Sequence, residues 1–128
     1  MFNSKLINKF KTLETPFYHY DLTLFRKTLA HVNDLSNKYK FDIHYAVKAN
    51  SNSKILEEAR QFGFGADCVS GNEIKASIEC GFCASKILFA GVGKTDKEIR
   101  YALDKNIKSF NCESIQEMEI INELAAQV

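Results

Sequence analysis

Hydrophobic positions fall into two kinds of segment that alternate along the chain. Four short apolar runs, each four or five residues long, start at intervals of about 22 residues. They cover residues 43–47, 66–69, 87–90 and 109–112. Apolar runs of this length, bounded by turn-forming residues, are typical of buried β-strands.

The segments around these runs repeat apolar residues every three or four positions, which predicts amphipathic helices. The first covers residues 21–39, and each run is followed by another. Their apolar stripes are Ile55, Leu56, Ala59 and Phe62; Ile74 and Ile78; Ile99, Ala102 and Leu103; and Ile115, Met118, Ile121 and Leu124. Capping boxes, in which a hydroxyl and a glutamate bind free backbone N–H groups, are expected at Ser70, Thr95 and Ser114. Gly63, Gly65 and Gly81 are expected in turns with positive φ.

Strands alternating with helices predict parallel strands joined by right-handed crossovers. Neither a leucine-rich consensus nor a G-x-G-x-x-G turn is present, so the regular unit favours a (β/α)8 TIM barrel. A complete barrel needs about 200 residues or more, and the chain has 128. We therefore expect the N-terminal part of a barrel, with about four β/α units, over residues 21–128. Residues 1–20 form a separate segment with one extended strand near Pro16.

Composition and charge exclude several classes of protein. The 17 Lys and Arg residues nearly balance 16 Asp and Glu residues, which leaves no basic excess for nucleic acid. No apolar run is long enough to span a membrane, and the polar first 15 residues do not resemble a secretory signal. We expect a cytoplasmic protein that binds neither nucleic acid nor membranes.

Four cysteines raise the alternative of a zinc-binding interaction module. Cys80 and Cys83 have C-x-x-C spacing, but structural zinc sites usually combine two such pairs. Cys68 and Cys112 lie far apart in apolar runs, where cysteine behaves as a small buried hydrophobe. We therefore predict no metal site and four reduced thiols.

The first apolar run leads to a candidate nucleophile. Side chains alternate along a strand, so Ile43, Tyr45 and Val47 share the face that packs on helices. His44 and Lys48 then point into the barrel, with Lys48 at the carboxyl end of the strand, where barrel enzymes carry their chemistry. A partly desolvated lysine amine can attack an aldehyde to form a Schiff base. A solvated strand terminus is the alternative for Lys48.

The second run places a carboxylate near this lysine. Asp67 alternates with Ala66 and Cys68 and should therefore also point inward. A buried carboxylate needs a partner, and Lys48 on the neighbouring strand is the one we expect. The alternative is that Asp67 belongs to a surface loop.

These residues carry a resemblance to a known family. The segments Tyr45-Ala-Val-Lys-Ala-Asn-Ser-Asn, Gly65-Ala-Asp-Cys-Val-Ser-Gly-Asn-Glu, Ile87-Leu-Phe-Ala-Gly-Val-Gly-Lys-Thr-Asp and Phe110-Asn-Cys-Glu-Ser are similar to those of diaminopimelate decarboxylases. The first segment is shared by the wider group of alanine racemases and group IV decarboxylases. The third is more particular to diaminopimelate decarboxylases.

The resemblance implies a fold, a cofactor and an activity. Lys48 would hold pyridoxal 5'-phosphate, and Asp67 would lie near it. For Glu73 we expect the capping role, and a contact with the cofactor is the alternative. The family decarboxylates a small amino acid, meso-2,6-diaminopimelate, to L-lysine, and it works as a homodimer. Its phosphate-binding and ring-stacking residues and its C-terminal β-domain follow later in the family's sequences, so we expect this chain alone to be inactive.

Two alternatives stay open within the same superfamily. One is a non-enzymatic pyridoxal-phosphate homeostasis protein built on a bare barrel. The other is a related group IV decarboxylase that acts on ornithine, arginine or carboxynorspermidine.

Overall fold

A computed structural model describes residues 3–128, and its sheet has the predicted parallel topology. The four strands, β1 (His44–Ala46), β2 (Gly65–Cys68), β3 (Ile87–Phe89) and β4 (Ser109–Phe110), lie in the order β1-β2-β3-β4. All neighbouring strands are parallel. Each strand after β1 thus pairs with the one before it in sequence, as in the wall of a β/α barrel.

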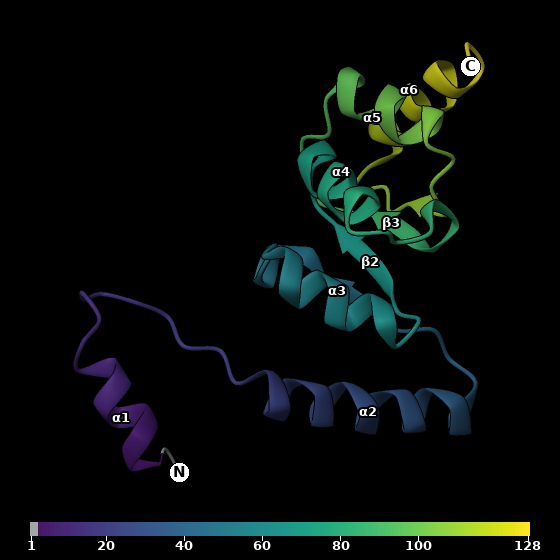
Figure 1. Ribbon diagram of the computed structural model, residues 1–128. Coiled ribbons are helices and arrows are strands. Elements are labelled where there is room, and N and C mark those ends of the chain that lie inside the picture. The colour runs from purple at the N-terminus through teal and green to yellow at the C-terminus, as the bar shows by residue number, and fades with distance from the viewer. Residues whose placement is uncertain (1–2) are drawn as a thin grey trace.

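Helices follow each strand and precede the first. They are α1 (Ser4–Phe10), α2 (Leu22–Tyr39), α3 (Ser53–Gln61), α4 (Gly71–Glu79), α5 (Asp96–Asp104) and α6 (Ile115–Ala125), with short 3-10 turns at Val47–Ala49 and Ala84–Lys86. Figure 1 shows α2 beside α3, with α4, α5 and α6 following in order along the sheet. The helices predicted from the apolar stripes are all present, so the partial-barrel fold is confirmed.

One face of the sheet carries the hydrophobic core. Fully buried side chains from α3, α4 and α5 meet fully buried side chains from the strands and from the turn after β1. They are Leu56, Ala59, Ile74 and Ala102 on the helices, and Val47, Ala66, Cys68, Ile87 and Phe89 on the sheet side. Burying each of the larger ones stabilises the fold by about 1.5–3 kcal/mol.

The opposite face of the sheet carries the other side chains of each strand. Asp67 is in register with Ala46 on β1 and with Leu88 on β3, which in turn pairs with Ser109 on β4. Asp67 and Leu88 are partly exposed, whereas their strand neighbours are buried. We call this surface the open face; it is the one that would line the inside of a closed barrel.

Helix α2 packs beside α3 through a polar contact. Arg26 Nε donates a hydrogen bond to Glu58 Oε2 at 2.7 Å, and a second guanidinium nitrogen donates to Oε1. Glu58 is 7% exposed. The guanidinium lowers the pKa of Glu58, mainly through this hydrogen bond.

Only one of the three expected capping boxes has the reciprocal form. At α5, Thr95 accepts from the Glu98 N–H and the Glu98 carboxylate accepts from the Thr95 N–H. At α4 and α6 the serine hydroxyl accepts as expected, but the glutamate accepts from the residue before the cap. Those donors are the Val69 and Glu113 N–H groups, each 2.8 Å from the carboxylate. The glutamates therefore also tie each helix to the end of the preceding strand.

The N-terminal segment differs from the prediction. Residues 15–20 form no strand, and the helix α1, which the apolar pattern did not predict, precedes them. The Asn3 side chain caps α1, and the Phe10 ring lies 5.3 Å from that of Phe17. Figure 1 shows α1 at the end of an irregular arm. The expected strand has no partner strand among the described residues.

Gly65 is not a positive-φ turn residue, although Gly63 and Gly81 are, with φ of +79° and +86°. It is the first residue of β2. A Cβ at this position would collide with the His44 imidazole and with the Lys86 carbonyl oxygen. Glycine is needed here for close approach, not for backbone conformation.

The four cysteines are free thiols. Cys68 is buried, as expected, but Cys112 is exposed because β4 ends at Phe110 and Cys112 lies in the following loop. In residues 3–128, no three His, Cys, Asp or Glu side chains gather closely enough to hold a metal ion. Within residues 3–128, each helix is too short or too polar to serve as a membrane span.

Candidate active site at the carboxyl edge of the sheet

Lys48 lies just past the carboxyl end of β1. The strand ends at Ala46, and Val47–Ala49 form a 3-10 turn, so the two-residue alternation used to orient Lys48 does not reach it. Val47 is fully buried and anchors the turn in the core, whereas Lys48 is exposed. The ammonium group makes no hydrogen bond or ion pair within residues 3–128.

Side-chain hydrogen bonds hold this turn in place. The Tyr45 hydroxyl donates to the Asn50 carbonyl oxygen at 3.1 Å, and the Asn50 N–H donates to the Val47 carbonyl at 3.1 Å. The Asn50 side chain accepts from the Asn52 N–H at 2.9 Å. The sequence reasoning missed these roles, although asparagines spaced two apart before a helix are a recognisable turn signal.

Asn52 continues this chain of contacts into the next helix. Its side chain accepts from the Lys54 N–H at 3.1 Å and caps α3. The position of Lys48 is therefore fixed on both sides, by the buried Val47 before it and by the capped helix after it.

Asp67 lies on the open face, one strand away from Lys48. It is in register with Ala46, two residues before Lys48, so the two side chains are not at the same level. No ion pair joins them in the described part of the chain, and the expected Lys48–Asp67 contact is wrong. Asp67 Oδ1 is buried and has no hydrogen-bond partner. An ionisable oxygen in this situation is costly unless another group binds to it.

His44 lies on the same face at the start of β1, paired with Gly65. Its Nε2 is also buried without a partner. Burial, with a smaller effect from the Lys108 ammonium, holds the pKa of His44 below its usual value. The inward direction expected for His44 thus agrees with its position.

Glu73 has a structural role in the loop after β2. Its N–H donates to the Ser70 hydroxyl at 3.2 Å, and its carboxylate accepts from the Val69 N–H at 2.8 Å. The carboxylate is engaged by backbone, which agrees with the expected capping role.

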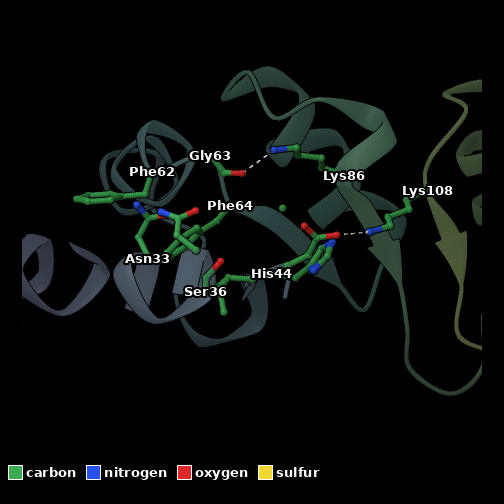
Figure 2. Close-up of a pocket in the computed structure, with 12 residues that line it drawn as sticks. Asn33, Ser36, His44, Phe62, Gly63, Phe64, Lys86 and Lys108 are labelled. Carbon is green, nitrogen blue, oxygen red and sulfur yellow. Dashed lines mark hydrogen bonds and ion pairs between the residues drawn. The ribbon is translucent and has the colours of Figure 1, made fainter. Parts of the chain in front are cut away.

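A polar cavity of about 240 Å³ lies at the opposite, amino edge of the sheet. Its lining includes Lys86 and Lys108, which precede β3 and β4 (Figure 2). Lys86 Nζ donates to the Gly63 carbonyl at 2.8 Å, and Lys108 forms an ion pair with Asp42 at 3.1 Å. Both ammonium groups already have acceptors, and residues at the amino edge of such sheets usually contribute to stability. The candidate site is therefore not at this edge.

The carboxyl edge offers groups that fit pyridoxal phosphate. Lys48 presents an unengaged primary amine, which can bond to the aldehyde carbon of that cofactor. Asp67 presents a buried carboxylate oxygen that lacks a donor. An amine in the turn after β1 and an unpartnered acceptor on the adjacent strand β2 suit a ligand with an electrophilic carbon and a polar ring.

Comparison with known proteins shows the family to which the chain belongs. The family described as pyridoxal-dependent decarboxylase, pyridoxal binding domain, matches residues 23–128. The chain therefore belongs to this family, whose description names pyridoxal as the group that the domain binds.

Individual proteins that are similar to this chain include decarboxylases with named substrates. The diaminopimelate decarboxylase of Bacteroides thetaiotaomicron is 56% identical over 94% of this chain, and that of Helicobacter pylori J99 is 41% identical over 98%. The structure is similar to that of the Helicobacter pylori diaminopimelate decarboxylase complexed with L-lysine, with a TM-score of 0.79 and 38% identity over 95% of this chain and 31% of that one. A viral arginine decarboxylase bound to agmatine is less similar, with a TM-score of 0.69 and 28% identity over 77% of this chain and 28% of that one.

The chain spans about 31% of the length of the Bacteroides relative and 30% of the Helicobacter one. The matched part contains Lys48 and Asp67 but only four strands.

Proposed function

We propose that this chain is the N-terminal part of a diaminopimelate decarboxylase, which converts meso-2,6-diaminopimelate to L-lysine with pyridoxal phosphate. The observation that carries the proposal is the unengaged Lys48 amine at the carboxyl edge, in a chain 56% identical to such an enzyme. From the same relationship we propose a cytoplasmic homodimer in which residues 21–128 begin the cofactor-binding barrel and residues 1–20 form a separate segment.

In this proposal Lys48 is the catalytic residue and holds the cofactor through its ε-amine. The buried Val47 and the Asn50 turn keep that amine at the carboxyl edge while leaving it accessible. Asp67 would bind a donor group of the cofactor with its unpartnered Oδ1. When bound, pyridoxal phosphate supplies an electron-accepting ring that stabilises the electron pair left by departing carbon dioxide.

The substrate assignment rests on the graded similarity to known decarboxylases. Identity to the diaminopimelate enzymes is 56% and 41%, and identity to the arginine decarboxylase is 28%. We therefore favour diaminopimelate over arginine, ornithine or carboxynorspermidine.

Covalent attachment of the cofactor tests the role of Lys48. The full-length enzyme that carries this segment would be loaded with pyridoxal phosphate, reduced with borohydride, digested and mapped by mass spectrometry. We expect the added mass on the peptide that contains Lys48. The Lys48→Ala variant should lose both the adduct and the visible absorption of the bound cofactor. Lys54→Ala, at an exposed lysine in the first turn of α3, is the matched control and should keep both.

Turnover tests the activity separately. The loaded enzyme would be assayed for carbon dioxide release from diaminopimelate, arginine, ornithine and carboxynorspermidine. Release of lysine from diaminopimelate supports the proposal, and preference for another substrate overturns the substrate assignment. Cofactor binding without any turnover would point to the non-enzymatic homeostasis protein, and an adduct that persists in Lys48→Ala would remove Lys48 from the site.

A further inference from the structure

We propose that Lys94, which lies in the loop between β3 and α5, is a positioning residue for the cofactor site. The inference rests on the proposed function, because it concerns the same carboxyl edge. Lys94 is the lysine of the Gly-Val-Gly-Lys stretch and has no role in the site described above. It is a buried cation, with only 1% of its side chain exposed.

The Lys94 ammonium group has a complete set of acceptors. It donates to the Gly91 carbonyl at 2.7 Å, to the Asn111 carbonyl at 2.9 Å and to both oxygens of Glu117 at 3.1 Å. An ammonium carries three N–H donors, and three groups receive them. The ammonium also lies 5.5 Å from the centre of the Phe89 ring on β3.

These acceptors belong to two successive strand-to-helix connections. Gly91 lies in the loop after β3, Asn111 lies in the loop after β4, and Glu117 lies in the first turn of α6. Two further hydrogen bonds close a ring: the Gly91 N–H donates to Glu113 Oε1 at 3.2 Å, and the Glu113 N–H donates to Glu117 Oε2 at 2.8 Å. We call the ring of Gly91, Lys94, Glu113 and Glu117 the lysine clamp.

The lysine clamp also reaches the strand that carries Asp67. The Ala90 N–H donates to the Cys68 carbonyl at 2.8 Å, directly after Asp67 in β2. Gly91 has a φ of +93°, and a Cβ on it would lie 3.2 Å from Cβ of Val69. The loop held by Lys94 therefore packs on the carboxyl end of β2. A shift of this loop would change the position of Asp67.

The chemistry of the clamp requires lysine. Arginine has a planar guanidinium and could not place three donors on acceptors around a single nitrogen. An uncharged side chain would leave the Glu117 carboxylate, 13% exposed, without its counter-ion and two carbonyls without their donor. We expect the loops after β3 and β4 to shift when Lys94 is replaced, and the cofactor site beside them to lose its geometry.

Cofactor affinity of the full-length enzyme tests the proposal. The dissociation constant of pyridoxal phosphate would be measured by titrating the cofactor-free enzyme, together with the melting temperature. We expect Lys94→Met to raise the dissociation constant at least about tenfold, the scale on which removed outer contacts weaken a bound group. Lys97→Met makes the same change at an exposed lysine three residues further on and should leave it unchanged.

A double variant separates positioning from simple stability. Lys94→Met with Glu117→Leu removes both buried charges, which often restores stability. We expect its melting temperature to recover while its cofactor affinity stays weak. If Lys94→Met does not fold, Glu117→Gln keeps the side-chain volume, weakens the clamp and should raise the dissociation constant in the same direction.

Three results would overturn the inference. The first is a normal cofactor affinity in folded Lys94→Met, or in Glu117→Gln if Lys94→Met does not fold. The second is an affinity that recovers together with the melting temperature in the double variant. The third is a wild-type enzyme that binds no pyridoxal phosphate, which overturns the proposed function as well; the first two overturn this inference alone.

Discussion

At the start of β2, the missing side chain of Gly65 makes room for the His44 imidazole on the neighbouring strand. The two residues form a large–small pair on the open face. Such pairs are how barrel interiors fill their layers without overlap. The space on the other side of Gly65 is bounded by a backbone oxygen, that of Lys86, which cannot rotate away.

We predict that Gly65→Ala destabilises the protein by about 3 kcal/mol, the upper part of the range for overpacked sites. Gly63→Ala meets no atom within 4 Å and bears only the strain of its positive φ, about 1 kcal/mol. Urea denaturation of both variants provides the comparison. Equal decreases in the free energy of unfolding for the two variants would contradict the prediction, because they would show that β2 shifts to accommodate the added Cβ.

Cysteine reactivity should differ sharply between two sites. Burial raises the pKa of Cys68 to about 12, whereas the Ser85 hydroxyl, 3.0 Å from the exposed Cys83 sulfur, lowers the pKa of Cys83. Because the thiolate is the nucleophile, Cys83 should be alkylated by iodoacetamide at lower pH than an ordinary thiol, and native Cys68 should not react. Peptide mass spectrometry across a pH series measures both, and Ser85→Ala should move the Cys83 profile to higher pH.

Among the helices, α4 and α5 are joined by one carboxylate. Glu98 accepts from the Thr95 hydroxyl and N–H at 2.7 and 3.1 Å in its own capping box, and from the Gly71 N–H of α4 at 2.9 Å. The Gly71 N–H, then the Thr95 hydroxyl and N–H, lower the pKa of Glu98 from its ordinary 4.5. A single ionised side chain thus satisfies the N-termini of two adjacent helices.

This contact predicts a pH dependence of stability. A carboxyl with a lowered folded-state pKa contributes stability that is complete above 4.5 and is lost as pH falls through the lowered value. Glu98→Gln should therefore cost about 1 kcal/mol at neutral pH and progressively less in acid. Unfolding free energies at several pH values measure this, with exposed Glu119→Gln as the control. A constant difference down to low pH would contradict the predicted linkage.

The order of the strands and of the helices α2 to α6 could be predicted from the sequence. Each of these elements has a local apolar pattern, and residues of that pattern pack in the structure. The turn at Lys48 could not, since it depends on the Tyr45 hydroxyl reaching the Asn50 carbonyl. The register that separates Asp67 from Lys48 is likewise a property of strand pairing, not of either strand. The burial of Lys94 depends on acceptors as many as 23 residues away, which no spacing rule reveals.

At the scale of the whole molecule, the sheet is covered on one face and open on the other. Asp67 and Leu88 remain partly exposed on the open face, and β1 and β4 are edge strands with one neighbour each. Unpaired backbone groups on edge strands favour association with other chains. Closure into a barrel would remove both features at once.

We predict that residues 1–128 expressed alone associate with one another, bind pyridoxal phosphate weakly and produce no lysine from diaminopimelate. The reason is that four strands provide Lys48 and Asp67 but leave the open face uncovered. Size-exclusion chromatography with light scattering over a dilution series, followed by a lysine assay, tests this, with the full-length enzyme as the control. A stable monomer would contradict the expected association, and measurable lysine production would contradict the expected lack of activity.

The sequential strand order has a consequence for synthesis in the cell. Every strand after β1 pairs with the strand made just before it, and the lysine clamp joins residues only 3 to 23 positions apart. Ribosomes add about 5–20 residues per second, so a new β/α unit emerges roughly every one to four seconds. Because its partners are already outside, each unit can dock as it appears. The loops beside Lys48 and Asp67 can thus be assembled in the order of translation, as each unit leaves the ribosome.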